Sequence, residues 1–281
     1  MSAFRFILKA SRPRFWIYVL GPFLVGLAGG YDIDAGVPLP AFVFAAFFLL
    51  PANLLIYGIN DIFDLETDKL NEKKAGYEQL VGRDRQRELL VWIALLNIPF
   101  FIYAAAATPQ LILPIAGFLF FSIFYSAPPI RAKAIPFLDS AFNILYIFPA
   151  IIAYRLAAGE YPPAALIAAG ACWAAAMHAY SAVPDIDADR NAGLSTTATL
   201  LGPARTLLLC GLLYLASAAI AFVYLPLFSV LGGIVYLALI AVSFPAVRQN
   251  TVFRIYKLFP AINSACGFVL FWAVVLQKIG H

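Results

Sequence analysis

Hydrophobic residues run along the chain in long blocks that short polar stretches separate. A helix that spans a membrane needs about 20 consecutive, mostly apolar residues, and we interpret each block of about that length as one spanning helix. The predicted spans are Phe15–Tyr31, Leu39–Asn60, Leu89–Thr108, Gln110–Ser126, Pro136–Ala158, Pro162–Val183, Ala204–Tyr224, Pro226–Val247 and Tyr256–Gln277. The pattern predicts an all-α integral membrane protein with about nine transmembrane helices and a single transmembrane domain over residues 1–281.

The composition supports a membrane protein, because 63% of the residues are hydrophobic and only 12% are charged. With the N-terminus inside, all Lys and Arg residues except Arg155 and Lys278 fall on the inside face. The positive-inside rule then predicts a multi-pass protein of the cell membrane with its N-terminus inside. The net charge of +4 is explained by this topology and gives no support to a nucleic-acid partner. We interpret the basic N-terminal arm, including Arg12, as an anchor to anionic lipid headgroups.

A group of acids, Asp61, Asp64 and Asp68, follows Asn60 at the end of the second span. Their spacing of i, i+3 and i+7 puts the carboxylates on one helix face if the helix continues through them. Like charges on one face repel, and a divalent cation between them relieves the repulsion. Oxygen ligands of this kind suit Mg²⁺, which usually also takes oxygens from a substrate phosphate. The alternative is a solvated acidic loop at the end of a helix.

A second acidic group ends the sixth span, where Asp185 and Asp189 stand one turn apart. His178 extends the same face into the membrane, whereas Asp187 points elsewhere unless Pro184 bends the helix. Both acidic groups lie on the predicted inside face. Together they predict a site for a metal-bridged diphosphate on that face.

Two segments could supply cations to such a site. After the fourth span, Pro128 and Pro129 stiffen a loop that carries Arg131 and Lys133. Arg can bind two phosphate oxygens at once and Lys can act as a point charge, although their topogenic role alone would explain both residues. The long polar loop from Lys69 to Glu88, which includes Lys73, is either a lid over the site or a plain solvated loop.

Two further polar features have simpler interpretations. Asp139 near the start of the fifth span either takes part directly in the site or caps the helix after Pro136. The run from Ser195 to Thr199 is predicted to provide local backbone hydrogen bonds before the seventh span. Cys172, Cys210 and Cys266 lie in separate spans and are expected to pack as small hydrophobic residues.

The motif Asn60-Asp61-x-x-Asp64-x-x-x-Asp68 and the motif Asp185-x-x-x-Asp189-x-x-x-Gly193 resemble the two aspartate-rich motifs of the intramembrane prenyltransferases of the UbiA superfamily. The segment from Tyr125 to Lys133 resembles the basic loop of that family. The resemblance implies a helical bundle around a central cavity, Mg²⁺ as cofactor, an isoprenyl diphosphate donor and a lipophilic acceptor in the bilayer. The metal ligands it implies are Asp61, Asp64, Asp68, Asp185 and Asp189, with catalytic roles for Asp61, Asp64, Asp185, Asp189, Tyr180 and His178. The diphosphate-binding residues it implies are Asn60, Arg131, Lys133, Lys73 and Arg190.

The identity of the acceptor is indicated by the run from His178 to Arg190, together with Asn60 to Asp64 and Lys73-Lys74. Many family members that prenylate aromatic rings carry Tyr-x-x-x-Lys-Asp, whereas here Pro184 stands four residues after Tyr180. The run is more similar to the carotenoid-modifying branch, the lycopene elongases. That likeness implies transfer of a prenyl group, from dimethylallyl diphosphate, to the end of a linear carotenoid such as lycopene.

Other functions remain open from the sequence. An aromatic, quinone-precursor or polar-lipid prenyltransferase would share the diphosphate site and differ in its acceptor alone. A membrane transporter with a divalent-cation site would also explain acids near a membrane. A transporter, however, is expected to carry them near the middle of the bilayer rather than at helix ends.

Overall fold

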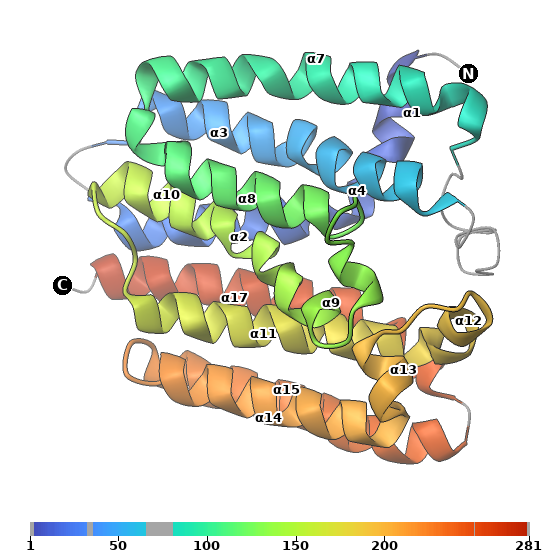
Figure 1. Cartoon of the computed structure of the whole chain (residues 1–281). Coiled ribbons are helices and arrows are strands. Elements are labelled where there is room, and N and C mark those ends of the chain that lie inside the picture. Colours follow the sequence, from blue (N-terminus) through green and yellow to red (C-terminus); the bar gives the residue numbers. More distant parts are fainter. Residues whose placement is uncertain (1–2, 33–35, 66–80, 250, 280–281) are drawn as a thin grey trace. The chain divides into compact units, whose positions relative to one another are not determined.

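The computed structural model describes residues 3–32, 36–65, 81–249 and 251–279, and every regular element in these ranges is a helix (Figure 1). The chain divides into two compact units. Unit 1 consists of residues 1–131 and 148–160, and unit 2 consists of residues 132–147 and 161–281. The single domain over residues 1–281 stays a prediction, and each unit is described by itself.

In unit 1, most of the helices are formed by the apolar blocks of the first half of the chain. Its elements are α1 (Ala3–Ala10), η1 (Pro13–Phe15), α2 (Ile17–Gly30), α3 (Leu39–Leu49), α4 (Pro51–Phe63), α7 (Arg83–Ala107), η3 (Pro109–Leu111), α8 (Ile112–Phe124) and α10 (Phe148–Ala158). Helix α10 packs along α2 and contacts α3 and α8, whereas α4 packs against α1, α7 and α8. Phenylalanine rings fill the interior, with Phe47 touching Phe48 and Phe118. The packed core therefore lies between α3, α4, α8 and α10.

Helix α2 approaches α10 closely at two glycines one turn apart. A β-carbon added at Gly26 would lie 2.1 Å from the backbone oxygen of Ala150, and one at Gly30 would lie 2.7 Å from that of Tyr154. Small residues four apart let helix backbones approach in membranes, where van der Waals packing is a main source of association. These two glycines therefore set the distance between α2 and α10.

Unit 2 surrounds the long helix α11. Its elements are η4 (Ala132–Ala134), α9 (Leu138–Ala141), η5 (Phe142–Tyr146), α11 (Ala164–Ala182), η6 (Val183–Asp185), α12 (Ile186–Asn191), α13 (Thr197–Leu201), α14 (Pro203–Ala221), α15 (Pro226–Arg248), α16 (Val252–Tyr256) and α17 (Phe259–Ile279). Helix α11 packs against α14, α9 and η5, and α15 packs against both α14 and α17. The short elements α9 and α12 both contact α13 at one end of the unit (Figure 1).

Each predicted apolar segment contains helix, but two segments are interrupted at prolines. The second segment divides at Leu50, and the fifth divides at Ile147 between η5 and α10. Pro51 and Pro149 follow shortly after these breaks, and a proline ring lacks the N–H and crowds the carbonyl of the preceding turn. Both segments are nevertheless long and apolar enough to cross a membrane as the helices Leu39–Phe63 and Leu138–Ala158, which agrees with one span for each.

Most of the long helices have the length that is needed to span a membrane. Within the ranges that the structure describes, seven helices are long and apolar enough to cross a membrane, and Pro109–Phe124 is a shorter apolar helix. This result agrees with a multi-pass membrane protein. The number of nine spans and the inside location of the N-terminus stay predictions.

The close approach of α2 and α10 gives a test of this packing. We expect Gly26→Ala to lower the melting temperature of the purified protein, because the added methyl group forces the two backbones apart, at a cost of about 1–3 kcal/mol. Gly21→Ala on the same helix is the matched control, since its β-carbon would meet nothing closer than 3.7 Å. Equal melting temperatures for the two variants in thermal unfolding would contradict the assigned contact.

Candidate active site

The first acidic group lies at the end of α4 in unit 1. Asp64 is fully buried and Asp61 is 5% exposed. The N–H of Asp64 donates to the backbone oxygen of Asn60 at 2.9 Å, but its own φ of −111° and ψ of 3° leave the helical region. Aspartate often ends a helix in this way, because its short side chain competes for local hydrogen bonds. Helix α4 therefore ends at Phe63 with Asp64 as its C-cap, and the predicted shared face with Asp68 lies outside the described residues.

The carboxylate of Asp64 is held by residues from three parts of unit 1. Its Oδ2 accepts hydrogen bonds from Asn60 Nδ2 at 2.5 Å and from Ser126 Oγ at 3.2 Å. Asn60 Nδ2 also donates to Ser126 Oγ at 3.1 Å. On the other side, Arg131 Nη2 lies 3.8 Å from Asp64 Oδ1. A buried carboxylate needs such donors. Asn60, Asp64 and Arg131 therefore lie together within unit 1, and their shared role in a diphosphate site stays a prediction.

The carboxylate of Asp61 is paired with a residue that we had assigned to the lipid surface. Arg12 Nη2 lies 2.5 Å from Asp61 Oδ1, and the Arg12 side chain is only 11% exposed. The guanidinium also lies over the ring of Tyr57, 4.8 Å from its centroid. The lipid-anchor interpretation is therefore wrong for Arg12. This contact could not be predicted from spacing, because 49 residues separate the two partners.

The second acidic group lies in unit 2, where the chain bends at Pro184. Helix α11 ends at Ala182, the turn η6 follows, and α12 begins at Ile186. Asp185 and Asp189 are half-buried, whereas the Asp187 side chain is 96% exposed. The predicted difference between Asp187 and the other two acids is therefore confirmed.

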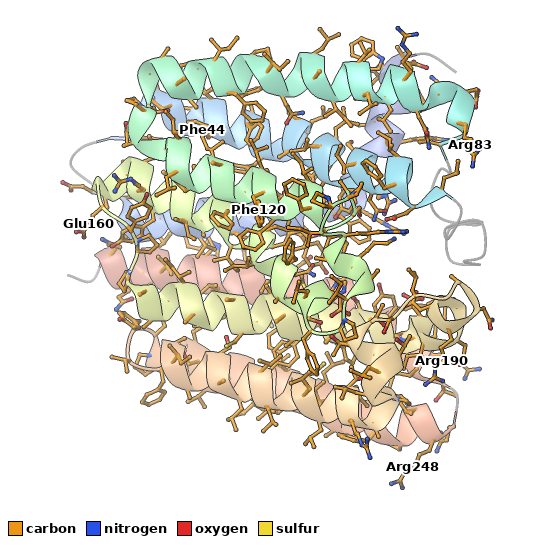
Figure 2. All side chains as sticks on the ribbon, in the orientation of Figure 1. Phe44, Arg83, Phe120, Glu160, Arg190 and Arg248 are labelled. Carbon is orange, nitrogen blue, oxygen red and sulfur yellow. The ribbon has the colours of Figure 1, made fainter. Side chains whose placement is uncertain are left out.

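The exposed residue Arg190 lies in the last turn of α12 (Figure 2). Its Nη1 is 3.9 Å from Asp187 Oδ1, and its Nη2 is 3.4 Å from the backbone oxygen of Thr199. An exposed ion pair of this length contributes little to stability. The role of Arg190 in binding a diphosphate stays a prediction.

Tyr180 and His178 occupy different environments on α11. Tyr180 is 1% exposed, its hydroxyl lies 2.9 Å from Ser243 Oγ, and its ring lies 4.7 Å from that of Phe259. Ser243 in turn donates to the backbone oxygen of Leu239 at 2.7 Å. Tyr180 therefore joins α11 to α15 and α17. Its predicted catalytic role is not tested by this arrangement.

His178 is half-buried, and the charges of Asp139 and Asp185 act on its ring. Asp185 belongs to the second acidic group, and Asp139 belongs to the loop at the start of the fifth predicted span. Lys133 is half-buried in η4, shortly before that loop. These residues all belong to unit 2, and their joint role in a diphosphate site stays a prediction.

Two of the predicted site residues, Asp68 and Lys73, lie outside the described residues. Among the residues that are described, no three His, Cys, Asp or Glu side chains lie close enough together to hold a metal ion by themselves. The predicted metal ligands in the described part of the chain are Asp61 and Asp64 in unit 1 and Asp185 and Asp189 in unit 2, and their binding of a metal stays a prediction. Such pairs fit Mg²⁺, which usually takes one or two carboxylates and completes its shell with substrate phosphates and water.

The chain has extensive similarity to known proteins. It is 41% identical to the lycopene elongase/hydratase of Halobacterium salinarum over 97% of this chain and 99% of that protein. It is 38% identical to the lycopene elongase/hydratase of Haloferax volcanii over 92% of this chain and 85% of that protein. The structure of a UbiA homologue from Archaeoglobus fulgidus bound to GPP and Mg²⁺ superimposes with a TM-score of 0.73, with 25% identity, over 94% of this chain and 99% of that one.

The family model for UbiA prenyltransferases matches residues 19–275. That range contains both acidic motifs and the basic loop. Because the match covers most of the chain, and because relatives well above 30% identity align with nearly all of it, the protein belongs to the UbiA prenyltransferase family.

Proposed function

We propose that this protein transfers a prenyl group from an isoprenyl diphosphate, dimethylallyl diphosphate in the simplest case, to the end of a linear carotenoid such as lycopene. The observation that carries the proposal is the near full-length identity to proteins named lycopene elongase/hydratase, at 41% and 38%. The site residues support it, because both acidic motifs and the basic loop are present in the chain.

In this proposal the donor diphosphate binds to cations of the basic loop and, through the metal, to carboxylates of the acidic motifs. Arg131 grips two phosphate oxygens and Lys133 adds a point charge. The hydrogen bonds from Asn60 and Ser126 hold Asp64 in one orientation before the donor arrives. Little reorganisation is then needed on binding, which favours catalysis by preorganised charge.

The cofactor of the proposal is Mg²⁺, which the carboxylate pairs of the two acidic groups would hold against the diphosphate. The solved structure of the Archaeoglobus fulgidus homologue carries Mg²⁺ together with GPP, and oxygen donors are the preferred ligands of this ion. When bound, Mg²⁺ would neutralise negative charge that develops on the leaving oxygens.

The reaction breaks the bond between the allylic carbon and the diphosphate oxygen and leaves an allylic cation. The terminal double bond of the carotenoid attacks this cation, which forms a carbon–carbon bond and moves the positive charge to a tertiary carbon. The tertiary cation then loses a proton or captures water. The apolar helices exclude bulk water from the first cation, and His178 or Tyr180 is the side chain that we assign to the final step.

The proposed location follows from the charge distribution. The protein lies in the cell membrane with its N-terminus inside and its active site open to the cytoplasmic side, because nearly all Lys and Arg residues then face inward. The donor reaches the site from the aqueous side, and the carotenoid reaches it from the bilayer.

The acceptor is tested by expressing the chain in a bacterium engineered to accumulate lycopene and analysing the pigments by mass spectrometry. We expect carotenoids that are heavier by one or two five-carbon units, with added water if the cation is hydrated. Unchanged lycopene, in cells that contain the folded and inserted protein, would reject the carotenoid acceptor.

The carboxylates are tested by Asp64→Ala and Asp185→Ala. We expect each to lower the rate of prenyl transfer by roughly 100-fold or more, because each removes a charge that binds the metal-bridged diphosphate. Asp187→Ala is the matched control from the same turn, since the Asp187 side chain is 96% exposed, and it should retain activity. Full activity of Asp64→Ala or Asp185→Ala in purified, inserted protein would refute the metal-site assignment.

The basic loop is tested by Lys133→Ala. We expect the KM for the prenyl diphosphate to rise about tenfold through loss of a charge-assisted contact, with little change in the KM for the carotenoid. Arg205→Ala, which removes an exposed cation at the start of α14, serves as the control and should leave both constants unchanged. An unchanged KM for the donor in Lys133→Ala would count against a contact between Lys133 and the diphosphate.

A further inference from the structure

A buried carboxylate of unit 2 joins two loops without belonging to either acidic motif. Asp139 is fully buried at the start of α9. Its Oδ2 accepts a hydrogen bond from the backbone N–H of Thr197 at 2.8 Å. Its Oδ1 accepts hydrogen bonds from the hydroxyl of Thr197 and from the N–H of Ser140. The carboxylate thus binds Thr197 twice across 58 residues of sequence.

The hydroxyl of Thr197 also acts as a hydrogen-bond acceptor. It accepts a hydrogen bond from the backbone N–H of Phe137 at 2.7 Å. Phe137 has a φ of 68°, which is unfavourable for a residue with a bulky side chain, so the backbone there is held by its contacts. We refer to the contacts among Phe137, Asp139 and Thr197 as the Asp139–Thr197 clamp.

Two sets of hydrogen bonds cap the start of α13. Thr196 is the N-cap of α13, and its side chain accepts from the N–H of Thr199 while the Thr199 hydroxyl accepts from the N–H of Thr196. This reciprocal pair satisfies the N–H groups of Thr196 and Thr199, whereas the N–H of Thr197 donates to Asp139. The bonds between Thr197 and Asp139 therefore complete the cap and at the same time fix one loop to the other.

Each of the two loops is tied by backbone bonds to a predicted site residue. On the first loop, the N–H of Asp139 donates to Ile135 O, and the N–H of Ile135 donates to Ala132 O, both at 3.0 Å. These bonds enclose Lys133. On the second loop, the N–H of Leu194 donates to the backbone oxygen of Asp189 at 2.8 Å. The clamp therefore connects a turn that carries Lys133 to a turn that carries Asp189.

We propose that the Asp139–Thr197 clamp is a positioning device that fixes Lys133 relative to the Asp185 and Asp189 pair and thereby sets the affinity for the diphosphate. The proposal rests on the diphosphate site of the proposed function. Asp139 and Thr197 act through Lys133 and Asp189 and do not touch the substrate. A fixed backbone at Lys133 is expected to raise the affinity, because less conformational freedom is then lost when its flexible side chain binds the diphosphate.

The test uses two variants of Thr197 in the full chain, purified in lipid nanodiscs. Thr197→Val keeps the branched shape and removes the hydroxyl, whereas Thr197→Ser keeps the hydroxyl. Thr206→Val is the matched control, because Thr206 is fully buried in the same unit. Its hydroxyl donates to the backbone oxygen of Gly202, four residues earlier in the chain, at 2.7 Å. Calorimetry measures the Kd of inorganic diphosphate in the presence of Mg²⁺, and thermal unfolding measures stability.

We expect Thr197→Val to weaken diphosphate binding about tenfold, which corresponds to the loss of one well-made polar contact. Thr197→Ser should bind within about twofold of the unchanged protein. Thr206→Val should lower the melting temperature but leave the Kd within the same range. Prenyl transfer by Thr197→Val should show a raised KM for the donor and an unchanged KM for the carotenoid.

Three outcomes would overturn the proposal. Thr197→Val could bind diphosphate as the unchanged protein does, Thr206→Val could weaken binding equally, or the unchanged protein could fail to bind diphosphate at all. Diphosphate binding that depends on the Thr197 hydroxyl, in a protein that transfers no prenyl group, would support the clamp and reject the proposed function.

Discussion

An ionised carboxylate inside an apolar helix bundle is stable only when hydrogen-bond donors surround it, and this requirement governs the structure around Asp64. Asn60 supplies a donor from the same helix, and Ser126 supplies one from the segment after α8. Arg131 adds positive charge from the following turn. The end of α4 and the segment after α8 are therefore held together by the need to satisfy one buried charge.

The positions of the helices could be predicted from the sequence, because each apolar block is long enough to form its own hydrogen-bonded element in a membrane. The interruptions at Leu50 and Ile147 were missed, although Pro51 and Pro149 were visible. Prolines are common in membrane helices and many leave them continuous. Their presence alone therefore did not distinguish a tolerated proline from one that divides a helix.

The candidate site was predictable where it depended on spacing within one element. Asp61 stands in α4 and Asp64 directly after it, and Asp185 and Asp189 stand in the consecutive elements η6 and α12, so each pair is separated by about one helical turn of sequence. The partners of these acids were not predictable in the same way. Arg12 reaches Asp61 from another helix, and such a contact depends on tertiary packing, of which a single sequence carries no direct signal.

The division of the chain between the two units has a consequence for biosynthesis. Residues 148–160 belong to unit 1, but the segments before and after them belong to unit 2. While the ribosome is still making α10, the face of α2 that carries Gly26 and Gly30 cannot yet pack against it. At that stage α11 has not been made either, so residues 132–147 lack the helix against which they pack. Domains usually fold as units during synthesis, the N-terminal one first. Here the first unit cannot be completed until translation has passed through the opening segment of the second, so the insertion and folding of the two units are interleaved in time.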